Sequence, residues 1–239
     1  MAEQHILGER LPGWEAAVMP QRETLEGRVA RLEPLSADAH AARLFDAYKG
    51  HDALWDYMGY GPFGTPQAYY LWAKEHEAVD DLRLHALIDK DRGICGSVMG
   101  FLRMEPAKGS IEIGHICHSP PLQHSLAATE AIWLMLDWVF KSGYRRCEWK
   151  CDALNLGSRR AAQRLGFNFE GIFRQHLVIK GRNRDTSWFA IIDKEWPALS
   201  DALRQWLSPD NFDGSGQQKR RLSDMTAPLR VASDPALDV

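Results

Sequence analysis

The segment HSPPLQHSLAATEA, residues 118–131, carries the strongest chemical signal in the sequence. Its pattern is typical of a strand end, a short loop and the start of a long helix. The first backbone N–H groups of a helix have no internal partners, and the helix dipole adds positive potential there. Such a junction can bind a diphosphate through peptide groups alone. The alternative interpretation is that Pro120 and Pro121 only start a helix.

Asn155 and Ser158 form a second candidate, because they lie three residues apart at the predicted start of a short helix. That spacing places them on adjacent parts of the helix surface. Ser158, Ala162 and Leu165 follow an i, i+4, i+7 pattern, so the serine faces an otherwise apolar side. Taken alone, these residue types favour a capping box with a small packed serine over a catalytic hydroxyl.

Cysteines are potential metal or redox ligands, and the chain has four of them. Four are too few for a disulfide scaffold in a chain of 239 residues, which is typical of a reducing compartment. Cys147 and Cys151 lie in a strand-like segment, where residues four apart are separated by roughly 13 Å, too far for one ion or one disulfide. A site joining one cysteine to His115 and His118 is the minor alternative to buried, apolar cysteines, and we expect no metal.

The elements that must position these residues follow from hydrophobic periodicity and turn signals. Strands are predicted over residues 29–35, 82–89, 94–105, 110–119, 144–152, 167–181 and 185–193. Helices are predicted over residues 37–49, 66–80, 122–141 and 155–165. Because helices interrupt a meandering set of strands without any repeat, we expect a single α+β domain.

Composition and charge limit the domain organisation and the class of function. We expect an N-terminal arm over residues 1–24, one domain over 25–207 and a loosely ordered C-terminal tail over 208–239, where few large apolar residues occur. The net charge of −3 argues against nucleic acid as a partner. Because no window has the length of a membrane span and the first residues lack a secretory signal, we expect no membrane association and a cytoplasmic protein.

Four short motifs in a fixed order carry a family resemblance: residues 111–116 (IEIGHI), residues 122–131 (LQHSLAATEA), residues 155–167 (N-x-x-S followed by RLGF), and residues 169–171 (FEG). Over roughly 170 residues the chain resembles the GNAT superfamily of acyl-CoA-dependent N-acyltransferases, and most closely its ribosomal-protein alanine acetyltransferase branch. The resemblance implies a mixed, mostly antiparallel central sheet of about six to seven strands, flanked by helices and splayed between its fourth and fifth strands.

The resemblance also implies acetyl-CoA as co-substrate. The family's Q-x-x-G-x-G/A loop falls on Gln123, Leu126 and Ala128, with Leu126 in place of the usual glycine. A leucine supplies its N–H as glycine does, but a positive φ there would be costly. The residues that would contact the cofactor are Ile116, Cys117, His118, Gln123, His124, Ser125, Leu126, Ala127, Ala128 and Asn155.

Catalytic roles follow from the same resemblance, which gives Ser158 as the proton donor to the departing thiolate. An amine must lose its proton before it attacks, so a base is useful at neutral pH. Where this branch places a glutamate base, this sequence has Leu177, so neither that base nor a ribosomal substrate follows. The alternative bases are Glu112, His115, Glu148, Asp152 and His176, and of these we assign catalytic roles to Glu112 and His115.

The acceptor pocket is expected beside residues 54–63, a segment richer in aromatic side chains than an exposed loop requires. Trp55, Tyr57, Tyr60 and Phe63, together with His176, are the predicted substrate contacts, and a hydrophobic plug is the alternative interpretation of the loop.

Two hypotheses for function result. One is an N-acetyltransferase in which a primary amine attacks acetyl-CoA directly. The other is an acyl-CoA-binding sensor or interaction module with little turnover. The amine, the choice between acetyl and succinyl donors, and a possible homodimer stay open.

Overall fold

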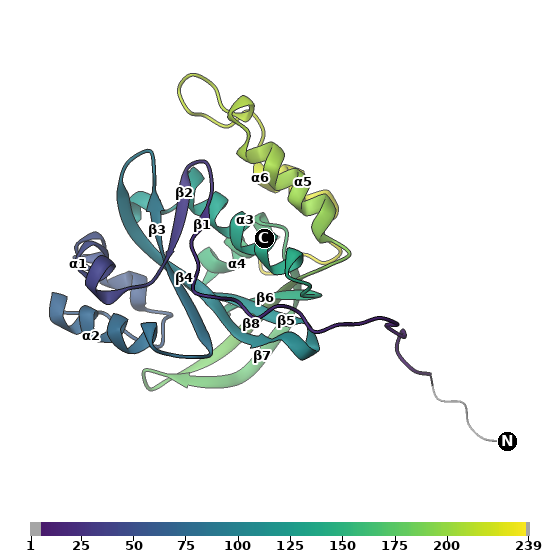
Figure 1. Cartoon of the computed structure of the whole chain (residues 1–239), viewed down its shortest axis with the longest axis horizontal. Helices are drawn as coiled ribbons and strands as arrows, with labels where there is room; N and C mark the ends of the chain where they lie inside the picture. Colours follow the sequence, from purple (N-terminus) through teal and green to yellow (C-terminus); the bar gives the residue numbers. More distant parts are fainter. Residues whose placement is uncertain (1–5, 238–239) are drawn as a thin grey trace.

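A computed structural model describes residues 6–237, and its core is one eight-stranded sheet (Figure 1). The strands are β1 (Leu25–Glu26), β2 (Ala30–Pro34), β3 (Leu82–Asp89), β4 (Ile94–Glu105), β5 (Ser110–His118), β6 (Arg146–Asp152), β7 (Asn168–Ile179) and β8 (Arg182–Ile192). Their order in the sheet is β1-β2-β3-β4-β5-β6-β8-β7, and all neighbours are antiparallel except β5 and β6. The expected α+β class is therefore confirmed. The eighth strand, which was not expected, is β1. It has only two residues, too few to show the alternation of apolar and polar side chains that indicates a strand.

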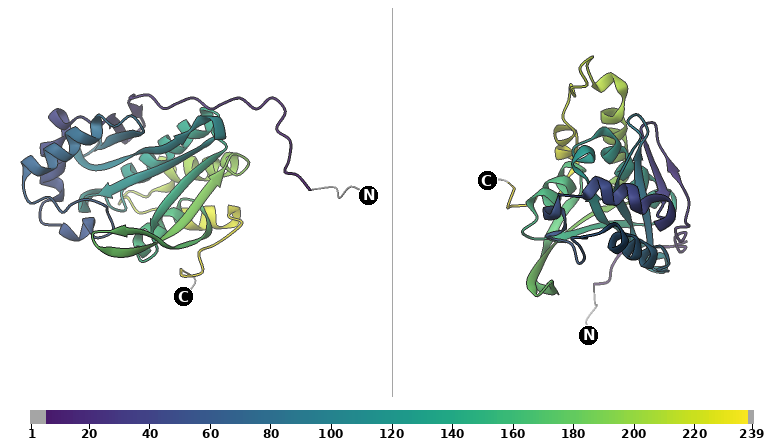
Figure 2. Two further views of the ribbon diagram at one scale, coloured as in Figure 1. Left: turned by 90° about the horizontal axis from the view of Figure 1, so that it is seen from below. Right: turned by 90° about the vertical axis from the view of Figure 1, so that its left-hand side faces the viewer.

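Six α-helices cover the two faces of the sheet (Figure 2). They are α1 (Ala37–Tyr48), α2 (Pro66–Glu77), α3 (Leu126–Lys141), α4 (Leu156–Arg164), α5 (Trp196–Leu207) and α6 (Leu222–Thr226). Side chains cap four of them, because an oxygen at the N-cap accepts a free N–H of the first turn. The capping residues are Ser36, Thr65, Ser125 and Asn155.

Two apolar cores lie on opposite faces of the sheet. In the larger core, α3 packs against the sheet and α5 packs against the outer side of α3. Met135, Leu136 and Val139 are consequently fully buried, which explains why α3 is apolar on nearly every side. The second core packs α1, α2 and residues 54–63 against β3 and β4 on the other face.

The parallel pair β5–β6 separates after three residue pairs. Ser110, Ile111 and Glu112 pair with Arg146, Cys147 and Glu148, and the remainders of both strands have no pairing with each other. The β4–β5 register also shifts between Val98 and Gly100, and β5 bulges opposite this point. This divergence matches the splay that the family resemblance implies, and it opens a gap in the backbone ladder between the two strands.

The C-terminal segment differs from the expected loose tail. Leu222 and Met225 are buried in the larger core, and the returning chain lies beside α4 (Figure 1). Asp234 is fully buried and forms an ion pair with Arg159 of α4 through two contacts of 2.6 and 2.5 Å. The polar composition of the segment suggested disorder, but its polar groups are satisfied by partners far away in the sequence.

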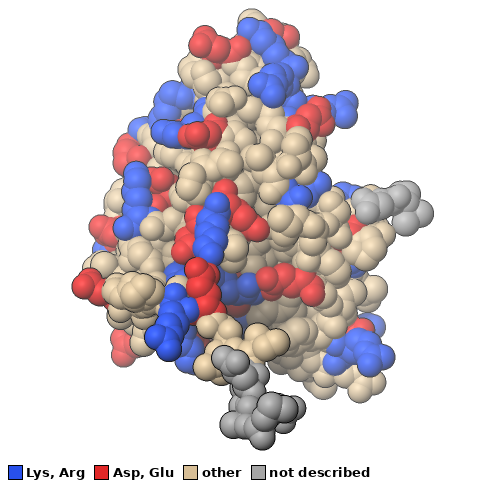
Figure 3. Space-filling model, turned by 90° about the vertical axis from the view of Figure 1, so that its right-hand side faces the viewer, with Lys and Arg blue, Asp and Glu red and all other residues tan. Residues whose placement is uncertain are grey.

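The expected N-terminal arm has neither helix nor strand over residues 6–24, and its first five residues lie outside the described part of the chain. Trp14 packs under the guanidinium of Arg145, 5.6 Å from the ring centroid, and Ala17 N–H donates to the Pro106 carbonyl. Acidic and basic side chains are interspersed on the face that Figure 3 shows. Within residues 6–237 no helix has the length and apolar character needed to cross a membrane.

Candidate active site

The start of α3 borders the open end of β5 and presents unpaired N–H groups. Ser125 Oγ accepts the Ala128 N–H at 3.0 Å and donates to the Leu122 carbonyl at 2.8 Å. Gln123 Nε2 donates to the His118 carbonyl at 3.2 Å, which closes the loop on itself. Among residues 6–237, the N–H groups of Leu126 and Ala127 have no hydrogen-bond partner. They are therefore free to bind an anion at the positive end of a 16-residue helix.

A hollow of about 410 Å³ lies directly beside these N–H groups. It is lined by Val29, Asp89, Asp91, Arg92, Pro121, Gln123, Ser125, Leu126 and Ala127. Positive φ occurs in this loop at His124, with a value of 57°, and Leu126 is the first residue of α3. The leucine in the family's glycine position is therefore unstrained, and the concern raised by its residue type does not apply.

Asn155 and Ser158 come together at the start of α4. Asn155 Oδ1 accepts the Ser158 N–H at 3.0 Å, as a capping side chain does. Ser158 Oγ accepts the indole N–H of Trp149, which lies on β6, also at 3.0 Å. Burial raises the pKa of the neighbouring Cys151 to about 11, and a hydrogen bond from Ser158 partly opposes that shift. Ser158 thus lies next to β6, beside the indole of Trp149 and the thiol of Cys151.

The side chains of Cys117 and His118 point into the protein. Cys117 is buried, and its carbonyl accepts the Tyr48 hydroxyl at 2.8 Å. His118 Nδ1 lies 2.7 Å from Ser97 Oγ, and burial lowers the pKa of His118 to about 4. Of the predicted cofactor contacts on β5, these two can therefore offer a ligand only their backbone, whereas Ile116 packs against the larger core.

His115 lies on the opposite face of the sheet and is paired with Tyr60. Tyr60 belongs to residues 54–63, which we call the aromatic loop. The Tyr60 hydroxyl is 2.9 Å from His115 Nδ1, and the two rings stack at 9° with centroids 5.6 Å apart. Burial, followed by the charges of His76 and Arg103, lowers the pKa of His115 to about 4. The imidazole is consequently neutral at neutral pH and can accept a proton.

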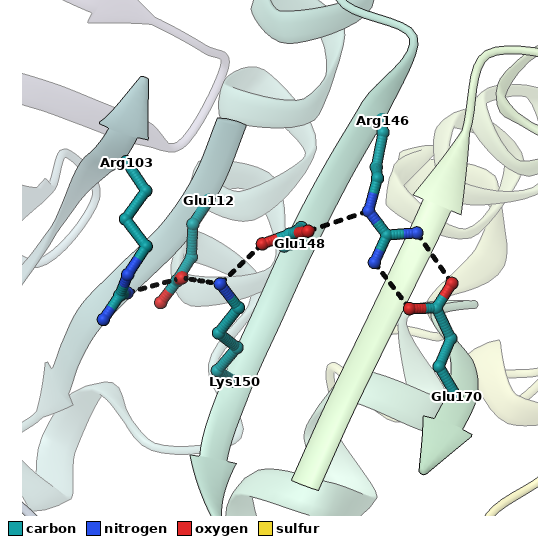
Figure 4. A network of polar contacts seen from close by, with 6 residues as sticks. All are labelled: Arg103, Glu112, Arg146, Glu148, Lys150 and Glu170. Carbon is teal, nitrogen blue, oxygen red and sulfur yellow. Dashed lines mark hydrogen bonds and ion pairs between the residues drawn. The ribbon is translucent and has the colours of Figure 1, made fainter. Parts of the chain in front are cut away.

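A ladder of alternating charges crosses the sheet on the face opposite α3 (Figure 4). Its consecutive members are Arg103, Glu112, Lys150, Glu148, Arg146 and Glu170. Both cations beside Glu112 contact Oε2, Arg103 at 2.6 Å and Lys150 at 2.9 Å. The other oxygen, Oε1, lies next to Gly114, where a Cβ atom would be only 3.2 Å from it. Glycine at this position therefore leaves Glu112 Oε1 uncovered at the last β5–β6 residue pair, beside the splay.

Most aromatic side chains of the aromatic loop are packed against one another and are not exposed in a pocket. Trp55 is 3% exposed, and its ring meets those of Tyr48 and Phe63 with centroid distances of 5.1 Å in each case. Tyr57 is 37% exposed and is not among the rings that contact one another in this cluster. The loop therefore combines a buried plug, one tyrosine that reaches His115, and one tyrosine at the surface.

His176 joins the same face from β7. Its Nδ1 is 3.0 Å from the Thr186 hydroxyl, and Glu112 and Lys150 are close enough to influence its pKa. The structure thus brings Glu112, His115, Tyr60 and His176 to one side of the splay, and Ser158 to the other. Lys150 and Thr186 were missed by sequence reasoning, although the alternation of residues 146–152 predicts that Lys150 shares a face with Glu148.

No group of three or more metal-ligating side chains gathers within the described residues, 6–237. The Cys147 and Cys151 side chains are both buried in the larger core.

Residues 30–168 match the acetyltransferase (GNAT) domain family. A GCN5-related N-acetyltransferase from Brucella melitensis is 44% identical, with a TM-score of 0.88 over 91% of this chain and 100% of that one. An acetyltransferase of the GNAT family from Chromobacterium violaceum is 40% identical, with a TM-score of 0.76 over 83% of this chain and 100% of that one. RimL, a ribosomal L7/L12 α-N-protein acetyltransferase, is 17% identical, with a TM-score of 0.63 over 74% of this chain and 99% of that one. This similarity shows a shared fold alone. No curated protein matches the sequence.

Proposed function

The chain belongs to the acetyltransferase (GNAT) family, and on this basis we propose that it transfers an acetyl group from acetyl-CoA to a primary amine of a small molecule or of a peptide or protein N-terminus. The observation that carries the proposal is the splay between β5 and β6. Free N–H groups of α3 lie at its open end, and the Glu112 carboxylate and the His115 imidazole lie on the other face. A donor can thus enter from one side and an acceptor from the other.

The start of α3 fits the phosphate-bearing half of acetyl-CoA. The N–H groups of Leu126 and Ala127, beside the hollow, would hold the diphosphate. The pantetheine arm would follow β5 into the splay, where the strand N–H groups near Ile116 would donate to the thioester carbonyl as negative charge develops on its oxygen.

Proton transfer needs one group on each face. Glu112 Oε1 or the neutral His115 imidazole accepts the proton that the attacking amine loses as its nitrogen bonds to the carbonyl carbon. The carbon–sulfur bond then breaks, and the Ser158 hydroxyl donates to the thiolate that leaves. No covalent acyl-enzyme is required, because the nitrogen nucleophile reacts directly.

A thiol-release assay over a matrix of acyl-CoA donors and amine acceptors tests this function. We expect free CoA to appear with acetyl-CoA only when an accepted amine is present. CoA binding in calorimetry without amine-dependent release for any acceptor would instead identify an acyl-CoA sensor. Absence of CoA binding to the folded protein would overturn the site altogether.

Replacing Leu126 by proline should weaken CoA binding about tenfold or more. Leu126 is the first residue of α3 and Ser125 before it is extended, with φ −78° and ψ 157°, so a proline fits there and removes only the N–H. Loss of a hydrogen bond to a charged group is worth roughly 1.5–3 kcal/mol. Calorimetry should show near-normal affinity for Leu126→Ala, which keeps the donor, and only a small loss for Gln123→Ala. Equal affinities for the proline and alanine variants would contradict phosphate binding by this N–H.

Replacing Tyr57 by alanine should raise the apparent KM for the amine and leave that for acetyl-CoA nearly unchanged. Tyr57 is exposed and lies outside the packed rings, so its removal takes away acceptor contact without opening the second core. Steady-state kinetics with each substrate varied in turn measures the effect. Phe63→Ala is the comparison, because its ring packs against Trp55 and its loss should lower the melting temperature instead. An unchanged amine KM in Tyr57→Ala would remove this residue from the pocket.

A further inference from the structure

Arg184 on β8 is a half-buried cation without a carboxylate partner. Its Nε donates to the Thr186 hydroxyl at 3.2 Å. No Asp or Glu within residues 6–237 forms an ion pair with it. Asp185, its neighbour in sequence, accepts hydrogen bonds from the Gln175 N–H and the Asn183 amide instead. The terminal N–H groups of a half-buried guanidinium are therefore left without an anion.

Thr186 links Arg184 to the acceptor side of the splay. Its buried hydroxyl lies between Arg184 Nε and His176 Nδ1, at 3.2 and 3.0 Å. The Thr186 hydroxyl accepts from Arg184 Nε and shares a second hydrogen bond with His176 Nδ1, so it bridges the two side chains. Side chains alternate along a strand, so Arg184 and Thr186 share a face with Trp188, whose ring packs under Lys150 at 3.7 Å. Arg184 thus lies on the face of the charge ladder.

Positive charges dominate the electrostatics around His176. Desolvation lowers the pKa of His176, and Arg184, Arg103 and Lys150 lower it further, whereas only Glu112 acts in the opposite direction.

The charge ladder does not supply the missing anion. Its three cations, Arg103, Lys150 and Arg146, each contact one or two of its three carboxylates. The ladder is therefore neutral in itself, and Arg184 adds one net positive charge beside it. A partly desolvated cation is stabilised by an anion that reaches it, and a guanidinium binds the planar edge of a carboxylate or the oxygens of a phosphate through paired N–H groups.

We propose that the acceptor is an amine that also carries an anionic group, a carboxylate or a phosphate, and that Arg184 binds this group with the His176 imidazole beside it. The inference rests on the proposed function and names its substrate class. In this arrangement the anionic group anchors the acceptor at β8, and the amine is directed to Glu112 Oε1 at the splay. A neutral acceptor of the same size would leave the guanidinium unpaired.

Matched acceptors with and without the charge test the proposal. Ala-Asp amide is compared with Ala-Asn amide, and O-phosphoethanolamine with ethanolamine, by thiol release and by calorimetric binding to the CoA-saturated protein. We expect the wild type to favour the charged member of at least one pair by about 10- to 100-fold, and the favoured pair distinguishes carboxylate from phosphate. Arg184→Met should reduce that ratio to near one while the acetyl-CoA KM stays unchanged.

Arg182→Met is the control, because Arg182 is exposed at the turn between β7 and β8 and its removal changes the net charge equally. It should keep the wild-type ratio, and Arg184→Lys should restore part of it. Equal binding of both members of each pair by the wild type, or a preference that survives Arg184→Met, overturns the proposal. CoA binding is measured separately, so its absence would refute the acetyltransferase site itself.

Discussion

Replacing Asp234 by alanine should lower the free energy of unfolding by about 3–5 kcal/mol, because it leaves the Arg159 guanidinium buried without a counter-charge. Both side chains are almost entirely inaccessible, with 5% exposure for Arg159 and 0% for Asp234. The same aspartate also accepts the Ala236 N–H, and its own N–H donates to Gln163 on α4. Urea denaturation followed by circular dichroism measures the loss.

Asp224→Ala is the matched control, since Asp224 is an exposed aspartate of the same C-terminal segment and its removal should change stability by less than about 0.5 kcal/mol. The double variant Arg159→Met with Asp234→Leu removes both charges and should recover much of the loss. A loss for Asp234→Ala no larger than that of the control would mean that the C-terminal segment does not hold α4 in solution.

Ser158→Ala should reduce kcat on the order of 10²-fold, as expected when a single hydrogen bond to developing negative charge is lost. CoA should bind almost normally, because the proposed phosphate contacts lie at the start of α3. The substitution also leaves the Trp149 indole N–H without its acceptor, which adds a stability loss of about 1–3 kcal/mol. Stopped-flow and steady-state thiol release with saturating acetyl-CoA measure the chemical effect.

Trp149→Phe separates the two consequences, because it removes the same hydrogen bond while Ser158 keeps its hydroxyl. This variant should lose comparable stability but retain most of its kcat. Equal losses of kcat in both variants would assign Ser158 a structural role and leave a tyrosine or a water as the acid. Near-normal turnover in Ser158→Ala would have the same meaning.

Local pattern was sufficient to predict most elements of this fold. Helix starts follow from side-chain oxygens that reach N–H groups only two or three residues away, and Asn155 was recognised as a capping residue on that basis. Strand faces follow from a period of two, which separates Cys147 and Trp149 from Glu148 in β6. Both signals are short-range, so they are present in the order of residues before any tertiary contact forms.

Tertiary structure decided which of these residues meet. Sequence order indicated a catalytic role for His115 and a substrate contact for Tyr60, but only the packing of residues 54–63 on β5 brings the two rings together across 55 positions. It also placed Lys150 beside Glu112, which leaves one carboxylate oxygen uncovered beside the splay.

The C-terminal segment shows most clearly what the sequence predicted and what only the tertiary structure decided. Its composition suggested a loose tail, because few large apolar residues could offset the loss of chain entropy on ordering. The structure orders it through Arg159, Gln163 and Asn168, which satisfy its polar groups from 63 to 75 positions away. Local spacing determined most of the elements, and the order of four short motifs indicated the family, whereas α5 and α6 were not predicted. The pairing of buried polar groups depends on which surfaces meet in three dimensions, so only the folded chain could decide it.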